Sequence, residues 1–167
     1  MKSFLPTLPT LLPIVFEWAE EQEALILANG APLTECQQAD ADRAGVAHPE
    51  KIRVLQVEAL PQPDHDELKF IAKQIGLFSA RSAGINFGYG IYVRRGFWED
   101  RETLVHECVH IAQHEKRNGL RPFLTEYLRE CLDPGYPFGG MEQEAVVVAR
   151  DICRQTDPAV SSNETNG

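Results

Sequence analysis

Two histidines separated by one helical turn, His106 and His110, place the strongest constraint on how this chain folds. Residues four apart differ by about 400° of rotation in an α-helix, so both imidazoles leave the same face and can bind one metal ion. Glu107 lies about 100° around from His106, too far to join easily as a ligand but close enough to polarise a metal-bound water. The segment matches the HExxH pattern, which predicts a helix that carries a catalytic metal.

The residues around this motif favour a helix that faces a protein core. An apolar stripe at the i, i+3, i+4 and i+7 positions consists of Val105, Cys108, Val109 and Ala112. Asp100 or Thr103 can cap the start of the helix, and Asn118-Gly119 supplies its end. The same pattern also suits an ordinary amphipathic helix with histidines on its solvent-exposed side, so a metal site needs further ligands to support it.

A catalytic zinc site usually has three protein ligands and one open position for water, so a third ligand is required. The best candidate is Glu142, on a helix predicted to begin after Gly139-Gly140 and to run to about Arg154. Five apolar residues share its helical face: Ala145, Val146, Ala149, Ile152 and Cys153. A carboxylate on a buried stripe requires a partner, and a metal ion can serve as one. The alternative is a glutamate that is present only because the helix dipole favours acidic residues in the first turn.

Two other side chains are weaker candidates for the third ligand. Glu144 shares its helical face with Asp151 as well as with Val148, so we expect it to meet solvent. His114 lies eight residues from His106, which is about 12 Å along a straight helix and too far for both imidazoles to reach one ion. We therefore expect His114 to lie near the site or at the surface without binding the metal.

HExxH on one helix, followed by a glutamate within ExxA on a later helix, resembles the gluzincin metallopeptidases. The chain is more closely similar to the small bacterial proteins that pair an HExxH helix with a compact ExEA segment on a minimal zincin domain. The resemblance covers roughly residues 84 to 154. It implies that His106, His110 and Glu142 bind zinc, and that Glu107 acts first as general base and then as general acid.

The resemblance has one departure and two structural implications. Several gluzincins carry aspartate four residues after the glutamate ligand to orient a histidine, whereas this chain has Val146, so other residues must support the ligands. In zincins the strand before the active-site helix often lies at the sheet edge, where an extended peptide can add to it. Residues 84–95 correspond to that strand, although their glycines equally suit an interior strand. Some small gluzincins also shield the cleft with an N-terminal segment, which makes the residues before the first helix a candidate shield.

Hydrolysis of a carbonyl also requires a group that stabilises the developing oxyanion, and tyrosine is a suitable donor. Tyr136 lies on a predicted loop just before Glu142, and functional groups are often carried on such loops. Tyr127 lies on an amphipathic helix between the two ligand segments, where core packing alone accounts for it. We therefore prefer Tyr136 as the catalytic helper. Its alternative role, between Pro134 and Pro137, is to stiffen the loop.

The remaining segments predict helices and strands without regular β-α-β alternation, which indicates an α+β fold. Helices are expected over about 13–29, 34–44, 65–76 and 120–132, and strands over about 52–59 and 84–95, the latter as one bulged strand or a short hairpin. The resemblance implies a small zincin-like domain with a short, mainly antiparallel sheet packed by helices. We expect one domain over residues 1–156, with 1–60 of unknown role, and a disordered tail over 157–167.

Composition argues against several classes of protein. A net charge of −9 does not suit a nucleic-acid-binding surface, and no stretch reaches the roughly eighteen uninterrupted apolar residues of a membrane span. Prolines interrupt the apolar N-terminal stretch, and acidic residues follow it without a cleavage site, so export is not expected. The four cysteines are widely spaced and contain no CxxC, which is typical of reduced thiols in a cytoplasmic protein.

Three functions remain open on the sequence. The first is a zinc-dependent metallopeptidase that cleaves a peptide or protein substrate with a metal-activated water and Glu107 as general base. The second is a non-catalytic zinc-binding regulatory or sensing protein that acts through a protein partner. The third is a structural domain without a metal. Convergence of Glu142 on the two histidines would favour a metal site, because a chance HExxH helix has no reason to recruit that carboxylate.

Overall fold

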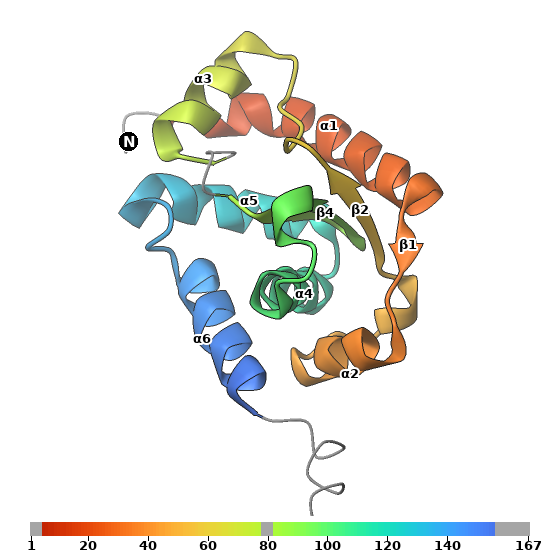
Figure 1. Ribbon diagram of the computed structural model, residues 1–167. Coiled ribbons are helices and arrows are strands. Elements are labelled where there is room, and N and C mark those ends of the chain that lie inside the picture. Colours follow the sequence, from red (N-terminus) through yellow and green to blue (C-terminus); the bar gives the residue numbers. More distant parts are fainter. Residues whose placement is uncertain (1–4, 78–81, 156–167) are drawn as a thin grey trace, which may run out of the picture.

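Six α-helices surround a four-stranded sheet in the computed structural model, which describes residues 5–77 and 82–155 (Figure 1). The elements, in chain order, are α1 (Leu8–Asn29), β1 (Ala31–Pro32), α2 (Glu35–Arg43), β2 (Arg53–Val57), α3 (Asp66–Ile75), β3 (Gly84–Phe87), β4 (Gly90–Arg94), α4 (Arg101–Lys116), α5 (Leu120–Glu130) and α6 (Gly140–Arg154). The fold is therefore α+β, as the sequence predicts. The tail over 157–167 lies outside the described residues.

The sheet is mixed and has the strand order β1-β2-β4-β3. The outer pairs β1/β2 and β3/β4 are antiparallel, but the central pair β2/β4 is parallel and has the longest register. The expectation of a mainly antiparallel sheet is therefore wrong at its centre. Residues 84–95 form a hairpin whose first strand takes the sheet edge, so β4 returns beside β2 in the same direction. Periodicity predicts which side chains are buried, but it does not predict which strands are neighbours.

Alternation along β4 divides the core into two layers, one on each face of the sheet. Ile91 and Val93 pack with residues of α2, α4 and α6. Tyr92 points to the opposite face and packs with residues of α1 and α5. The closest approach of α1 is at Gly90, where a β-carbon would lie 2.8 Å from the side chain of Ile26. A glycine at this position lets the helix pack directly on the strand.

α1 begins earlier than the sequence pattern predicts, at Leu8 rather than near Pro13. Proline is expected in the first turn of a helix, because it lacks the N–H that the helix interior uses. Pro9 occupies the first turn instead, and Pro13 lies inside the helix. The additional turn buries the side chains of Leu8 and Leu11, which accounts for the earlier start.

α4 runs through the middle of the molecule and is in contact with β3 and with α6, which packs against it (Figure 1). It ends at Lys116, and Asn118 and Gly119 follow with positive φ angles of 61° and 130°. Asparagine and glycine adopt such angles more readily than other residues, which is why the chain can turn here into α5. After this turn and α5, α6 packs against α4, which brings their facing side chains together.

None of the helices in the described ranges is long and apolar enough to cross a membrane. All four cysteines are free thiols. Cys108 and Cys131 are buried, Cys153 is partly buried and Cys36 is exposed. The fold is thus held by packing of the two core layers rather than by cross-links between these cysteines.

Candidate metal centre

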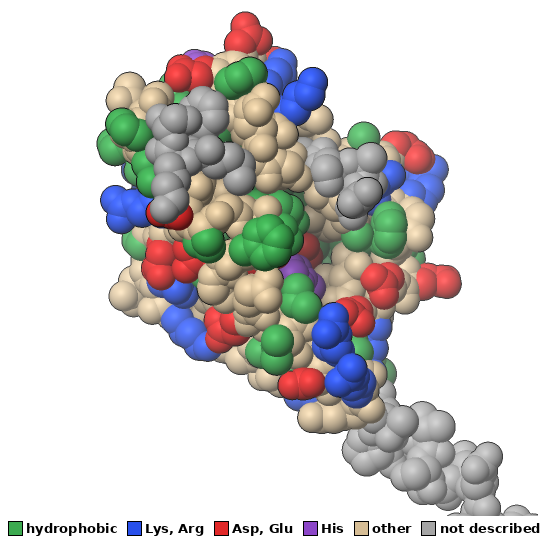
Figure 2. Space-filling model, turned by 90° about the vertical axis from the view of Figure 1, so that its left-hand side faces the viewer, with side chains coloured by type: hydrophobic (Ala, Val, Ile, Leu, Met, Phe, Trp, Pro, Cys, Tyr) green, Lys and Arg blue, Asp and Glu red, His purple; other side chains and the backbone are tan. Residues whose placement is uncertain are grey.

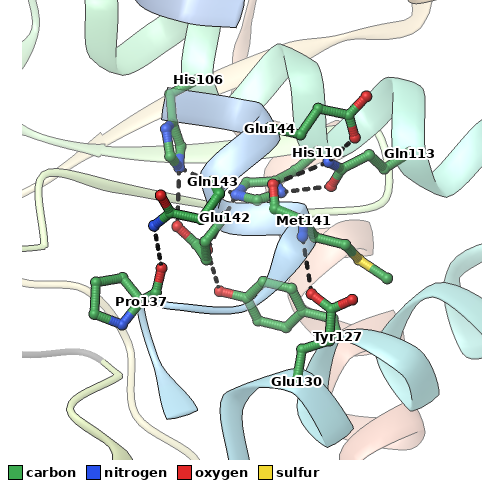
Figure 3. A network of polar contacts seen from close by, with 10 residues as sticks. All are labelled: His106, His110, Gln113, Tyr127, Glu130, Pro137, Met141, Glu142, Gln143 and Glu144. Carbon is green, nitrogen blue, oxygen red and sulfur yellow. Dashed lines mark hydrogen bonds and ion pairs between the residues drawn. The ribbon is translucent and has the colours of Figure 1, made fainter. Parts of the chain in front are cut away.

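α4 and α6 bring His106, His110 and Glu142 together. Their ligating atoms all lie within 4.8 Å of one another. The Nε2 atoms of the two histidines are 3.1 Å apart, and the Glu142 carboxylate lies 3.4 Å from Nε2 of His106 and 3.2 Å from Nε2 of His110 (Figure 3). Within the described part of the chain, this is the one group of three side chains arranged to hold a metal ion.

The spacing of these atoms fits a tetrahedral zinc site. Bonds of about 2.0–2.1 Å from zinc to nitrogen or oxygen separate any two ligand atoms of a tetrahedron by about 3.4 Å. The two histidine nitrogens are 3.1 Å apart, and each lies near a different oxygen of Glu142, His110 at 3.2 Å from Oε1 and His106 at 3.4 Å from Oε2, so each of these pairs is close to that value. Two imidazole nitrogens and one carboxylate oxygen are also the ligand types found in catalytic zinc sites. The residues present therefore fit the ion that the HExxH pattern implies.

The cluster is largely shielded from solvent. The side chains of His110 and Glu142 are 5% and 7% exposed, and that of His106 is 22% exposed. Figure 2 shows a histidine side chain in a recess bordered by hydrophobic side chains. Burial alone would raise the pKa of the Glu142 carboxyl, but its contacts, among them hydrogen bonds with His106 and with the hydroxyl of Tyr127, lower this pKa well below the usual range. The carboxyl is therefore ionised and offers a negative charge to a cation.

Glu107 faces the edge strand β3 and is not one of the three clustered ligands. The backbone amide of Asn86 lies close enough to the Glu107 carboxyl to lower its pKa. The strand approaches closely at Gly84, where a β-carbon would lie 3.2 Å from Cγ and Oε1 of Glu107. Burial raises the pKa of Glu107 to about 7, against the opposing effect of His106. A carboxyl group with this pKa can accept a proton and return it near neutral pH.

The two tyrosines considered from the sequence line the same cavity as the cluster. The hydroxyl of Tyr127 donates a 2.6 Å hydrogen bond to Oε1 of Glu142, so this tyrosine holds a candidate ligand in addition to packing in the core. Burial is the main cause of the raised pKa of the Tyr136 hydroxyl, and the nearby carboxylates of Glu142 and Glu107 raise it further. The Tyr136 hydroxyl therefore stays protonated and can donate a hydrogen bond.

Sequence reasoning missed one polar residue at the site, Gln113. This side chain is 1% exposed and lies 2.9 Å from Nδ1 of His110. Its amide nitrogen also donates a 2.8 Å hydrogen bond to the carboxylate of Glu144. Glu144 is exposed, as the sequence predicts. A signal was present in the sequence, because an amide three residues after His110 lies on nearly the same helical face. Its partners on α6 could not be read from α4 alone.

His114 stays outside the cluster, as the helical distance predicts. Its ring packs edge-on against Tyr89 and Phe123, and it is buried. Burial lowers the pKa of His114, so the ring is neutral at pH 7. His114 is thus a core residue one turn beyond the two candidate ligands.

An apolar cavity extends from the cluster between α1, α3 and α5. Its walls include Leu8 and Leu11 of α1, Leu68 and Ile71 of α3, and Leu124 of α5. The three candidate ligands and Glu107 line the same cavity and provide its charged or ionisable carboxyl and imidazole groups. The start of α1 therefore forms part of the wall around the site.

Comparison with known proteins assigns no family to this chain. No family model matches it, and no curated protein and no solved structure matches it either. The geometry and chemistry of its own residues are therefore the basis for any statement of function.

Proposed function

We propose that this protein is a zinc-dependent metallopeptidase in which His106, His110 and Glu142 bind the ion. The observation that carries the proposal is the approach of Glu142, from α6, to two imidazoles of α4 at separations that suit tetrahedral zinc. Zinc would supply Lewis acidity, which polarises a carbonyl group and lowers the pKa of water. The resemblance of the motif pair to gluzincins supports the same set of ligands.

Glu107 is the general base of this proposal. Its raised pKa, about 7, suits a group that removes a proton from the attacking water and later donates it to the leaving amine. The absence of a side chain at Gly84 leaves room for Glu107 to face the cavity beside β3. Tyr136 is the proposed donor to the developing oxyanion, since its protonated hydroxyl lies near both Glu107 and Glu142.

A peptide substrate is supported by the position of β3. Among the described strands, β3 pairs only with β4 and leaves its other edge open. Its residues Gly84 and Asn86 contact the proposed general base. An extended peptide that adds to this edge by main-chain hydrogen bonds would pass next to Glu107.

A non-catalytic zinc-binding regulatory protein is the second candidate, and burial of the site favours it. Of the three candidate ligands, only His106 has a side chain that is more than 7% exposed. An enclosed site can hold a structural or sensed ion without admitting a substrate. The partner of such a protein would be another protein, because a net charge of −9 disfavours a nucleic-acid-binding surface.

Zinc content tests the metal site that both candidates share. The purified protein should contain about one zinc per chain, which is the number that a single three-ligand site holds. His106→Ala should lose this zinc, whereas His48→Ala, at an exposed histidine outside the cluster, should retain it. A wild-type protein without zinc, or equal zinc in wild type and His106→Ala, would reject both candidates.

Cleavage of a broad peptide library separates the two candidates. Glu107→Gln should keep the zinc, because Glu107 is not a ligand, but it should lose cleavage, because an amide cannot accept the proton from water. If zinc-loaded wild type and Glu107→Gln behave alike across the library, the regulatory candidate replaces the peptidase.

A further inference from the structure

Gln113 is a fully buried amide whose two ends contact different partners. Its Nε2 donates to the carbonyl oxygen of Met141 at 3.0 Å and to Oε2 of Glu144 at 2.8 Å, both on α6. Its Oε1 lies 2.9 Å from Nδ1 of His110, one turn earlier on α4 (Figure 3). With 1% of the residue exposed, these protein atoms take the place of water around the amide.

These contacts determine which way the amide faces. A backbone carbonyl and a carboxylate can only accept hydrogen bonds, so the NH2 group of Gln113 must face Met141 and Glu144. The side-chain oxygen of Gln113 therefore faces His110, and it can only accept, so Nδ1 of that imidazole must carry a proton. A neutral imidazole has a single N–H, which leaves Nε2 of His110 with a free lone pair.

The free lone pair of His110 points into the cluster. Nε2 of His110 lies 3.1 Å from Nε2 of His106 and 3.2 Å from Oε1 of Glu142. A lone pair and a carboxylate oxygen at this distance repel each other unless a positive charge lies between them. His110 is therefore held in the form in which an imidazole binds a metal.

We propose that Gln113 is the positioning residue of the metal centre, that it holds His110 in its Nδ1–H tautomer, and that Glu144 fixes Gln113 in turn. This inference rests on the proposed metal site. It identifies where the support for a histidine ligand comes from in a chain that has Val146 at the position of an orienting acid. Such supporting hydrogen bonds fix the ring orientation and raise the basicity of the coordinating nitrogen.

The same amide couples the two helices that carry the ligands. Met141 and Glu144 flank Glu142 on α6, so their bonds to Gln113 set the position of Glu142 relative to His110. A carboxylate could not replace the amide here, because it would face a carbonyl oxygen and the carboxylate of Glu144 without a donor. The site thus requires a side chain that accepts at one end and donates at the other.

Zinc affinity tests this role directly, by competition with a chromophoric chelator. Gln113→Leu should bind zinc roughly 10–100-fold more weakly than wild type, which is the usual effect of losing a group that orients a ligand. Gln143→Leu is the matched control, because its amide donates to the carbonyl of Pro137 and makes no contact with His110. It should bind zinc like wild type. Equal affinities for wild type and Gln113→Leu would overturn the proposal.

The tautomer of His110 provides a readout that does not depend on zinc or on activity. In the zinc-free protein, ¹⁵N NMR of the imidazoles should show His110 protonated at Nδ1 in wild type, and a loss of that preference in Gln113→Leu. An Nε2–H tautomer in wild type would overturn the role of Gln113. An Nδ1–H tautomer in a protein that binds no zinc would instead overturn the proposed function, so the two failures are distinguishable.

A paired exchange keeps the test decisive if Gln113→Leu does not fold. Gln113→Glu alone should weaken zinc binding, because the new carboxylate faces Glu144. Adding Glu144→Gln restores an amide donor opposite a carboxylate acceptor, so the double variant should recover at least part of the lost affinity. Absence of any recovery would contradict the relay from Glu144 through Gln113 to His110.

Discussion

The hydroxyl of Tyr127 donates a 2.6 Å hydrogen bond to Oε1 of Glu142, the same oxygen that lies 3.2 Å from Nε2 of His110. Burial and the nearby carboxylate raise the pKa of Tyr127 well above the usual range, so the phenol remains a donor. Tyr127 therefore holds Glu142 on α6, and Gln113 contacts His110 on α4. The two candidate ligands that are buried most deeply are thus each held by one neutral hydrogen-bonding side chain.

Tyr127→Phe should weaken zinc binding by about 10-fold while leaving the fold intact, because it removes one hydrogen bond to a ligand carboxylate and keeps the ring that stacks on Phe123. Chelator competition measures the change. Tyr89→Phe is the control, since it also removes one hydroxyl that bonds to a glutamate, Glu115, at a distance from the cluster. An equal loss of affinity in both variants would show that the effect is general destabilisation.

Tyr136→Phe should behave differently from Tyr127→Phe. If Tyr136 stabilises the oxyanion, its loss should lower kcat roughly 100-fold, with little change in KM or in zinc affinity, because the interaction forms only in the transition state. Steady-state kinetics on a cleaved library peptide would measure this split. A Tyr136→Phe enzyme with wild-type kcat would leave the tyrosine with its alternative role of stiffening the loop before α6.

The apolar cavity predicts a preference for substrates with a large apolar side chain next to the cleaved bond. Replacing leucine by serine at that position of a peptide should lower kcat/KM by about 10–200-fold, the usual range for filling or emptying an apolar pocket. Ile71→Ser should weaken this preference, because Ile71 lines the cavity. Phe70→Ser, on the exposed side of the same helix, should preserve it. Equal cleavage of both peptides by wild type would exclude the cavity as a substrate pocket.

The sequence predicts features that depend on one helix at a time. The four-residue spacing places His106 and His110 on one helical face, and the apolar residues after Glu142 place this glutamate on the inward face of α6. Both predictions depend only on helical periodicity. Whether those two faces meet depends on how α4 and α6 pack, and the structure brings the three side chains together.

Features that depend on contacts between distant segments could not be predicted in the same way. Gln113 and Glu144 are 31 residues apart, and no local pattern encodes their hydrogen bond. The parallel pairing of β2 with β4 was missed for the same reason, since the pattern of each strand is compatible with several neighbours. The early start of α1 also follows from distant packing, because Leu8 and Leu11 are buried and form part of the cavity wall together with residues of α3 and α5.

Away from the metal centre, the ion pair between Asp40 of α2 and Arg101 at the start of α4 should make stability depend on pH. The guanidinium donates twice, from Nε to Oδ2 at 2.7 Å and from a terminal nitrogen to Oδ1 at 2.8 Å. The hydrogen bond with Arg101 outweighs burial and lowers the pKa of Asp40 below its ordinary value of 3.8. The Asp40 carboxyl therefore binds a proton less readily in the folded state than in the unfolded chain. The ion pair's contribution to the free energy of unfolding is present above pH 3.8 and is lost as the pH falls through the folded-state pKa.

Asp40→Asn should accordingly lower the free energy of unfolding by about 1–3 kcal/mol at pH 7, the usual cost of losing a partly buried hydrogen bond to a charged group. The difference from wild type should shrink as the pH falls below 3.8, where the wild-type carboxyl also becomes protonated. Urea denaturation of the zinc-free proteins at several pH values measures both effects. Glu20→Gln is the matched control, because Glu20 forms the same two-bond pair with Arg121 at the exposed surface, where solvent screening leaves a smaller contribution. If Asp40→Asn and Glu20→Gln lower the free energy of unfolding equally at pH 7, burial does not strengthen the ion pair between α2 and α4.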